Sequence, residues 1–214
     1  RPRLRKEVGF EALGGGGIEC STGSYVRITD CTITSNTAFS AGGGILCSNG
    51  SNPIILDCVI DSNQVIGPLG SGNGGGIAEL DSHPYVQRCQ ITNNAATNSG
   101  GGYYSGSNSG PQYLMSCVIS GNTAVYGGGY YMHNGSVPSV DNCVVSGNSA
   151  ELGGGIFVSS GSEELVNNFT IVGNTAEWGG AVYFPGAYSV DFTNCIIWGN
   201  IASVFGDGVY TTYP

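Results

Sequence analysis

Hydrophobic and polar residues alternate over short runs along this chain. In "CVIDSN" and "CVVSGN" the first and third residues are apolar, and a period of two places such residues on one face of a β-strand. The runs are interrupted by Gly, Asn, Ser and Pro, and none offers ten residues of helical periodicity. The pattern therefore predicts an all-β protein of short strands joined by tight turns.

Two motifs repeat at a nearly constant spacing. The first reads "DCTITSN" in its first copy and "NCIIWGN" in its last, and successive copies lie 26 to 31 residues apart. The second is a glycine run followed by an apolar residue, as in "GGGI". A fixed period of this length is typical of solenoid proteins. The first motif places its asparagine at Asn36, Asn63, Asn94, Asn122, Asn148, Asn174 and Asn200, and its cysteine at Cys31, Cys58, Cys89, Cys117, Cys143 and Cys195.

The repeat predicts a parallel β-helix in which each coil contributes two or three short strands. Coils stacked at the strand spacing of about 4.8 Å give about eight rungs of 26–28 residues, over residues 14–214. Residues 1–13 are expected to be an N-terminal segment or a partial cap. The third strand is expected around Ile28, Ile55, Val86, Leu114, Val140 and Val166.

Both repeated side chains have a structural interpretation. Stacked asparagines can hydrogen-bond from rung to rung as a ladder, and Asn tolerates the left-handed backbone of a tight corner. The cysteines are expected to stack inside the coil as small hydrophobic residues. Isolated disulfides between neighbouring rungs stay open as an alternative, whereas the chain has no C-x-x-C pair of the kind that binds metal.

Composition limits the function further. The chain has 38 Gly, 10% charged residues and a net charge of −9, which describes an acidic, loop-rich β protein. Outside the opening "RPRLRK" its only cations are Arg27 and Arg88, so nucleic-acid binding is not expected. No apolar run reaches membrane-spanning length. The chain opens on Arg1 without a signal peptide, and is therefore expected to be a mature or excised segment.

The segments "NCVVSGNSAELGGGIFVSS" and "NCIIWGN" resemble the repeats of known proteins. From about Gly14 to Tyr210 the chain is similar to the right-handed parallel β-helix proteins of the pectate-lyase-like superfamily, especially large bacterial secreted and cell-surface proteins. It is also distantly similar to polymorphic outer-membrane autotransporters, although their F-x-x-N motif is absent. The resemblance implies a single-stranded right-handed β-helix and an extracellular or cell-surface location. The superfamily's enzymes imply acidic clusters, often with calcium, but one fold hosts many activities.

One rung departs from the repeat. About five extra residues precede Ile77, and four ionisable residues follow it at Glu79, Asp81, His83 and Arg88. Together they could form an acid–base or metal site, or they could be polar residues of a local corner. Asp30 and Asp57 of adjacent rungs could likewise share a cation such as calcium, or they could be solvated turn residues.

A second candidate site is an outward column of aromatic residues, one on each of the last five rungs. Aromatic faces of this kind suit sugars or a partner protein, although stacked aromatics can also simply stabilise a sheet. Because basic residues are scarce, a neutral glycan is expected in preference to an acidic one. The aromatic strip consists of Tyr104, Tyr131, Phe157, Tyr183 and Tyr210.

The sequence thus favours a non-catalytic secreted or cell-surface module with a structural or adhesive role, which binds a polysaccharide or cell-surface glycan through the aromatic strip. No cofactor is expected, with calcium as the alternative. The first alternative function is a carbohydrate-active enzyme, a polysaccharide lyase or glycoside hydrolase, acting near Glu79. The second is a subunit of an extracellular fibre, with end-to-end self-association or with flanking domains of a longer chain.

Overall fold

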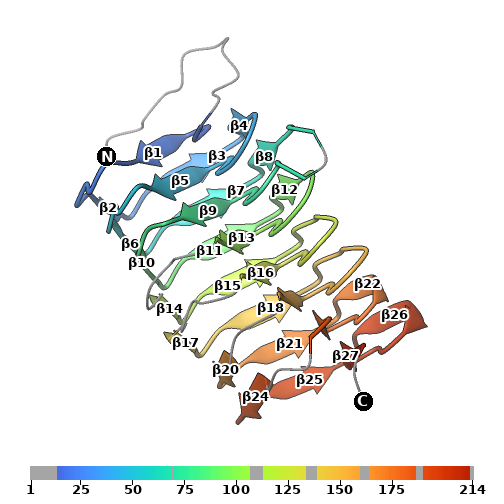
Figure 1. Cartoon of the computed structure of the whole chain (residues 1–214). Helices are drawn as coiled ribbons and strands as arrows, with labels where there is room; N and C mark the ends of the chain where they lie inside the picture. The colour runs from blue at the N-terminus through green and yellow to red at the C-terminus, as the bar shows by residue number, and fades with distance from the viewer. Residues whose placement is uncertain are drawn as a thin grey trace.

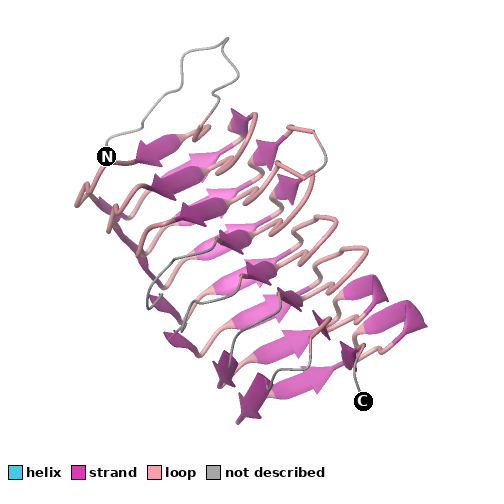
Figure 2. Ribbon diagram, viewed as in Figure 1, coloured by secondary structure: helices cyan, strands magenta, loops and turns pink. Residues whose placement is uncertain are grey.

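The computed structural model describes residues 14–68, 70–106, 113–133, 139–159, 164–186 and 190–212. The described residues wind as a coil of short strands from β1 (Ile18–Cys20) to β27 (Val209–Thr211) (Figure 1). The described residues contain strands and turns but no helix (Figure 2). Consequently they include no helix that could cross a membrane.

Three long parallel sheets form the walls of the coil. Sheet 1 contains β1 (Ile18–Cys20), β5 (Ile45–Ser48), β9 (Ile77–Leu80), β13 (Tyr103–Ser105), β16 (Tyr130–Met132), β19 (Ile156–Val158), β23 (Val182–Phe184) and β27 (Val209–Thr211). Sheet 2 contains β2 (Arg27–Thr29), β6 (Ile54–Leu56), β10 (Tyr85–Gln87), β14 (Tyr113–Met115), β17 (Ser139–Asp141), β20 (Glu164–Asn167) and β24 (Val190–Thr193). Sheet 3 contains β3 (Thr32–Thr34), β7 (Val59–Asp61), β11 (Gln90–Thr92), β15 (Val118–Ser120), β18 (Val144–Ser146), β21 (Thr170–Val172) and β25 (Ile196–Trp198).

Two smaller sheets close the remaining corner of the coil. They are formed by β4 (Thr37–Ala38), β8 (Gln64–Val65) and β12 (Ala95–Ala96), and by β22 (Thr175–Trp178) with β26 (Ile201–Phe205). Each named strand pairs in parallel with the equivalent strand of the next rung, for example Ile45 with Ile77. The parallel β-helix predicted from the repeat is therefore confirmed.

The rung count is lower than predicted. Sheet 1 has eight strands, but sheets 2 and 3 have seven each, because the last weak copy of the glycine motif adds β27 to sheet 1 alone. The described residues therefore complete fewer than the expected eight rungs. The predicted N-terminal segment or cap, residues 1–13, lies outside the described residues.

Glycines make the corner before each sheet 1 strand. Gly127 has φ of +64°, and a Cβ atom there would lie 2.4 Å from the carbonyl oxygen of Tyr130. At the next position, Gly128, a Cβ atom would lie 2.4 Å from the carbonyl oxygen of Ser149 in the following rung. The first contact reflects the left-handed backbone of Gly127, and the second reflects the close stacking of two rungs. The fold therefore requires the glycine run. A strand follows it, and not the helix that a phosphate-binding loop precedes.

The asparagine ladder runs without interruption from Asn36 to Asn200. In its middle, the backbone N–H and the side-chain Nδ2 of Asn148 both donate to Oδ1 of Asn174, each at 2.9 Å. The Nδ2 group of Asn148 also donates to the carbonyl oxygen of Ile119 at 3.0 Å, and Oδ1 of Asn148 accepts both donors of Asn122. The ladder predicted from the sequence is therefore confirmed, and its members are buried.

The cysteines also form the predicted column. Cys58, Cys89, Cys117 and Cys143 are buried inside the coil and are free thiols. Each donates to the carbonyl oxygen two residues earlier, as Cys117 Sγ does to Met115 at 3.2 Å. The two ends of the column differ, because Cys31 and Cys195 are only partly buried. All eight cysteines are free, including the buried Cys20 and Cys47 of sheet 1.

Removing one ladder amide should destabilise the whole coil. Asn148→Ala leaves the N–H of Asn122 and the carbonyl of Ile119 without their buried partner, at a cost of about 1–3 kcal/mol. Urea denaturation should show this loss in the free energy of unfolding. The matched control is Asn142→Ser. Asn142 lies at an exposed corner, and the equivalent residue of the previous rung, Ser116, has the same left-handed backbone. Equal stability of the two variants would count against the ladder.

The thiols should be protected by the fold. Ellman's reagent should reach Cys31 and Cys195 first and the six buried thiols only after unfolding.

The hydrogen bond with Cys117, together with burial, raises the pKa of Cys89 to about 12. Because this pKa exceeds that of the unfolded chain, the neutral thiol stabilises the fold below about pH 9, and the stabilisation is lost as the pH rises towards 12. A melting temperature that is constant or rises from pH 8 to 11 would contradict this.

Candidate functional site

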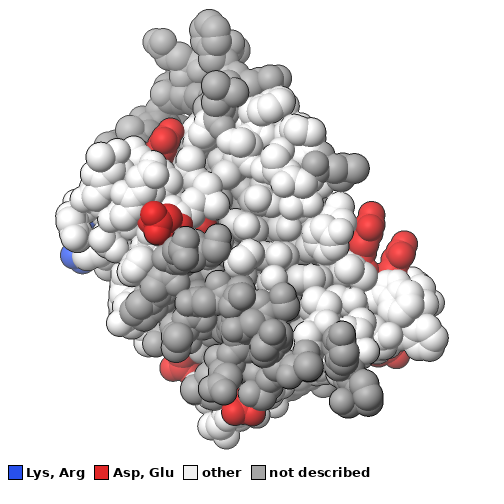
Figure 3. Space-filling view, viewed as in Figure 1, with Lys and Arg blue, Asp and Glu red and all other residues white. Residues whose placement is uncertain are grey.

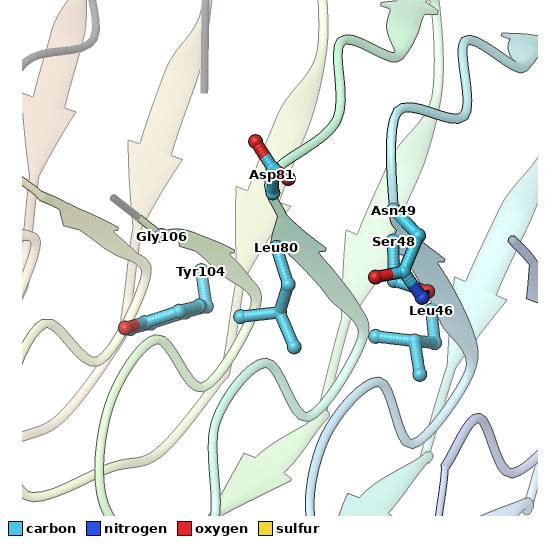
Figure 4. Close-up of a pocket in the computed structure, with 7 residues that line it drawn as sticks. All are labelled: Leu46, Ser48, Asn49, Leu80, Asp81, Tyr104 and Gly106. Carbon is cyan, nitrogen blue, oxygen red and sulfur yellow. Dashed lines mark hydrogen bonds between the residues drawn. The ribbon is translucent and has the colours of Figure 1, made fainter. Parts of the chain in front are cut away.

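The candidate site is a pocket on the outer side of sheet 1. It has a volume of about 450 Å³. Figure 4 shows Leu80 of β9 between Tyr104 of β13 and the residues of β5, with Asp81 beside it at the end of the strand. The pocket is lined by Leu46, Ser48, Asn49, Leu80, Asp81, Tyr104 and Gly106.

The pocket arises where the outward column of sheet 1 contains its smallest side chain. Leu46, Ala78 and Tyr104 are in register on consecutive strands. Because Ala78 carries only a methyl group, the side chain of Leu80 lies between Tyr104 and Leu46 (Figure 4), and Ala78 itself is fully buried. Ala78 and Leu46 pack with Leu80 in an apolar cluster outside the coil. This cluster gives the pocket an apolar floor.

Polar groups lie along the pocket's other side. Asn49 and Asp81 occupy the same corner of consecutive rungs, and both have a left-handed backbone, with φ of +52° and +51°. The backbone N–H of Gly50 donates to the carbonyl oxygen of Asp81, and Asn49 Nδ2 donates to Ser48 Oγ at 3.4 Å. The pocket therefore combines an apolar floor with a carboxylate, an amide and a hydroxyl, as ligand sites do.

The aromatic strip is a continuous stack. The ring centroids of Tyr104 and Tyr131 are 5.2 Å apart with an interplanar angle of 21°, and the next three pairs of the strip are 5.1, 5.4 and 5.7 Å apart and also stacked. Phe157 and Tyr183 are only 7% and 8% exposed. Ring faces within the strip therefore contact one another, and a ligand would meet mainly ring edges.

Tyr104 is the first ring of the stack and differs from the rings behind it. One of its faces stacks on Tyr131, and its side chain also lines the pocket together with Leu80 of the neighbouring strand. Burial raises the pKa of Tyr104 to about 12, so its hydroxyl stays protonated at neutral pH. Binding along the whole strip stays a prediction, and Tyr104 is the member of the strip that lines the pocket.

The sequence interpretation missed a second aromatic column beside the strip. Tyr126 contacts Phe157 with centroids 5.5 Å apart, and Trp178 contacts Phe205 and Tyr210 at 5.3 and 5.5 Å. The signal was present, because Tyr126, Trp178 and Phe205 each stand immediately before a glycine motif, in "VYGGG", "EWGG" and "VFGDG". These rings support the C-terminal part of the strip.

The four candidates of the irregular rung do not converge. Glu79 points into the coil, is fully buried and accepts a hydrogen bond from the Tyr103 hydroxyl at 3.0 Å. Asp81 lies outside at the pocket. His83 is half-buried on the segment leading to β10. Arg88 lies at the corner after β10, where its Nε and Nη2 groups donate to Asp57, both at 2.7 Å. A regular strand would place Glu79 and Asp81 on the same face, but β9 ends at Leu80 and Asp81 stands in a left-handed corner. A further strand separates both residues from Arg88.

The two corner acids differ in their contacts. Asp30 and Asp57 are at equivalent corners, but Asp57 is engaged by Arg88, which holds its pKa below the usual value. Within the described ranges there is no group of three or more His, Cys, Asp or Glu residues that could hold a metal ion. Asp57 and Arg88 therefore join two rungs, and a cation shared by Asp30 and Asp57 stays a prediction.

A parallel coil with in-register sheets and a buried asparagine ladder defines a β-helix repeat protein. In agreement, a family model described as a right-handed β-helix region matches residues 7–197. The chain therefore belongs to the right-handed β-helix family. No curated protein and no solved structure matches the chain.

Glu79 should support the fold through its hydrogen bond. Glu79→Gln retains an acceptor for the Tyr103 hydroxyl and should retain most of the stability. Glu79→Ala leaves that hydroxyl without its partner, at a cost of about 1–3 kcal/mol. Chemical denaturation of the two variants measures the difference. If both variants are as stable as the parent protein, this hydrogen bond does not support the coil.

Proposed function

We propose that this chain is a non-catalytic module of a secreted or cell-surface protein, and that it binds a carbohydrate without acidic groups at the Tyr104 pocket. The observation that carries the proposal is the ring of Tyr104 at one side of a pocket with polar groups on the other. A sugar presents C–H groups on its faces and hydroxyls at its edge. The C–H groups match the aromatic ring, and the hydroxyls match the carboxylate, amide and hydroxyl of the pocket.

Charge supports a ligand without acidic groups. The described pocket lining contains one acidic residue, Asp81, and no Lys or Arg. On the face drawn in Figure 3, acidic residues are scattered among uncharged ones, and basic residues are visible only at one edge. With a net charge of −9, the protein repels anionic polymers over a distance of several ångströms.

The separation of the ionisable groups supports binding without catalysis. General acid–base catalysis requires groups within hydrogen-bond reach of the reacting atoms, and glycoside hydrolysis typically uses two carboxyl groups that flank the bond. Among the described lining residues Asp81 is the only carboxylate, since Glu79 is enclosed in the coil. The enzyme alternative is therefore second to the binding module, and the fibre alternative stays a prediction.

A glycan array followed by titration with soluble oligosaccharides tests the proposal. Tyr104→Ala removes the ring at the pocket and should weaken binding about tenfold or more. Tyr113→Ala is the matched control, because Tyr113 is 40% exposed on sheet 2, away from the pocket. Circular dichroism should show that both variants keep the fold.

Three results would contradict the proposal in different ways. The absence of any glycan ligand would remove the proposed function. Binding that survives Tyr104→Ala but is lost in Tyr183→Ser would place the site on the C-terminal part of the strip. Binding or turnover that is lost in Glu79→Gln and His83→Ala would favour the enzyme alternative.

A further inference from the structure

Asp30 and Asp81 stand at exposed left-handed corners and have no side-chain hydrogen bond or ion pair with a described residue, and of these two Asp81 lines the pocket. The carboxylate of Asp57 accepts two hydrogen bonds from Arg88, and that of Asp61 accepts hydrogen bonds from Thr92 and Asn93. Asp81, by contrast, is exposed and has no side-chain hydrogen bond or ion pair with any described residue. Its charge is therefore available to a ligand in the pocket.

The surroundings of the pocket add to this negative charge. Glu19 stands in the same outward column as Leu46, one strand further along sheet 1. The cation Arg88 is paired with Asp57, and Arg27 lies in sheet 2. No described cation therefore lines the pocket. The electrostatic potential in the pocket favours positively charged groups.

The ring of Tyr104 has the same preference. The face of an aromatic ring carries partial negative charge and attracts an ammonium group close to it. Tyr131 stacks on one face of the Tyr104 ring, and Tyr104 and Asp81 both line the pocket. A carboxylate and an aromatic side chain thus border one partly enclosed space, where water screens charges less than in bulk solvent.

We infer that the pocket selects an amino sugar, a hexosamine unit whose free ammonium group pairs with Asp81 while its ring contacts Tyr104. The inference rests on the proposed function, because it names the class of carbohydrate bound at that site. Asn49 and Ser48 are within the same lining and offer partners to the remaining hydroxyls. An N-acetylated hexosamine lacks the positive charge and should bind less tightly.

Calorimetric titration with three oligosaccharides of equal length and linkage tests the inference. They are an oligomer of glucosamine with free amines, the same oligomer fully N-acetylated, and the corresponding glucose oligomer. Below the pH at which the amine loses its proton, the free-amine oligomer should bind at least tenfold more tightly than the other two. This advantage should shrink when the amine deprotonates and when the salt concentration rises.

Two variants separate the charge from the fold. Asp81→Asn should reduce the affinity for the free-amine oligomer to that of the acetylated one and leave the other two affinities nearly unchanged. Asp207→Asn is the matched control, because it removes the same charge from the corner before β27, at the far end of sheet 1. It should leave all three affinities unchanged.

The possible failures are distinguishable. If none of the three oligomers binds while the glycan array yields another ligand, the inference is wrong and the proposed function stands. If the array yields no ligand, or if Tyr104→Ala has no effect on binding, both fall. If the three oligomers bind equally and Asp81→Asn has no effect, the inference is wrong while the proposed function stands. If trilysine competes as well as the glucosamine oligomer, the pocket recognises ammonium groups of peptides, and the assignment to an amino sugar is overturned.

Discussion

The asparagine ladder is the constraint on which the rest of the structure depends. A tight turn inside a coil buries backbone N–H and C=O groups, and such groups must find partners. Each ladder amide supplies them, as Asn148 does for Ile119 of one neighbouring rung while it is bound to Asn174 of the other. Because these bonds connect equivalent positions, a rung cannot slip by one residue without losing them and turning its side chains to the opposite faces. The ladder thus fixes the register of every other column.

In-register stacking has opposite effects on small and on aromatic side chains. For cysteine and isoleucine it yields a continuous apolar interior. For the outward rings it means that each face is taken by the ring of the next rung, as between Tyr131 and Phe157, whose planes differ by only 4°. A perfectly regular aromatic column would therefore leave few faces for a ligand. Here the column of rings ends at Tyr104, because the next strand carries Ala78, and Tyr104 lines the pocket at this end of the stack.

The sequence allowed the fold and both ladders to be predicted because the same residues recur at the same positions, and stacking follows from periodicity alone. The candidate site was less predictable. Periodicity indicated that the rung of Ile77 is irregular, but it could not show that Glu79 is enclosed beside Tyr103 while Asp81 faces outward. The pocket depends on side-chain volumes on three adjacent strands. The second aromatic column, with Tyr126 and Trp178, was missed because it stands next to glycines that were interpreted only as corners.

The corner shared by Asn49 and Asp81 separates folding from function. Both residues adopt the same left-handed backbone, which asparagine tolerates as well as aspartate does. The fold therefore does not require a carboxylate at position 81. The exposed charge of Asp81 is part of a net charge of −9 and adds to the repulsion within the chain, and no described residue compensates for it by pairing. Asp57, in contrast, contributes to the fold through Arg88. A carboxylate that the backbone does not need, placed beside an aromatic ring at a pocket, is better explained by what it binds than by what it stabilises.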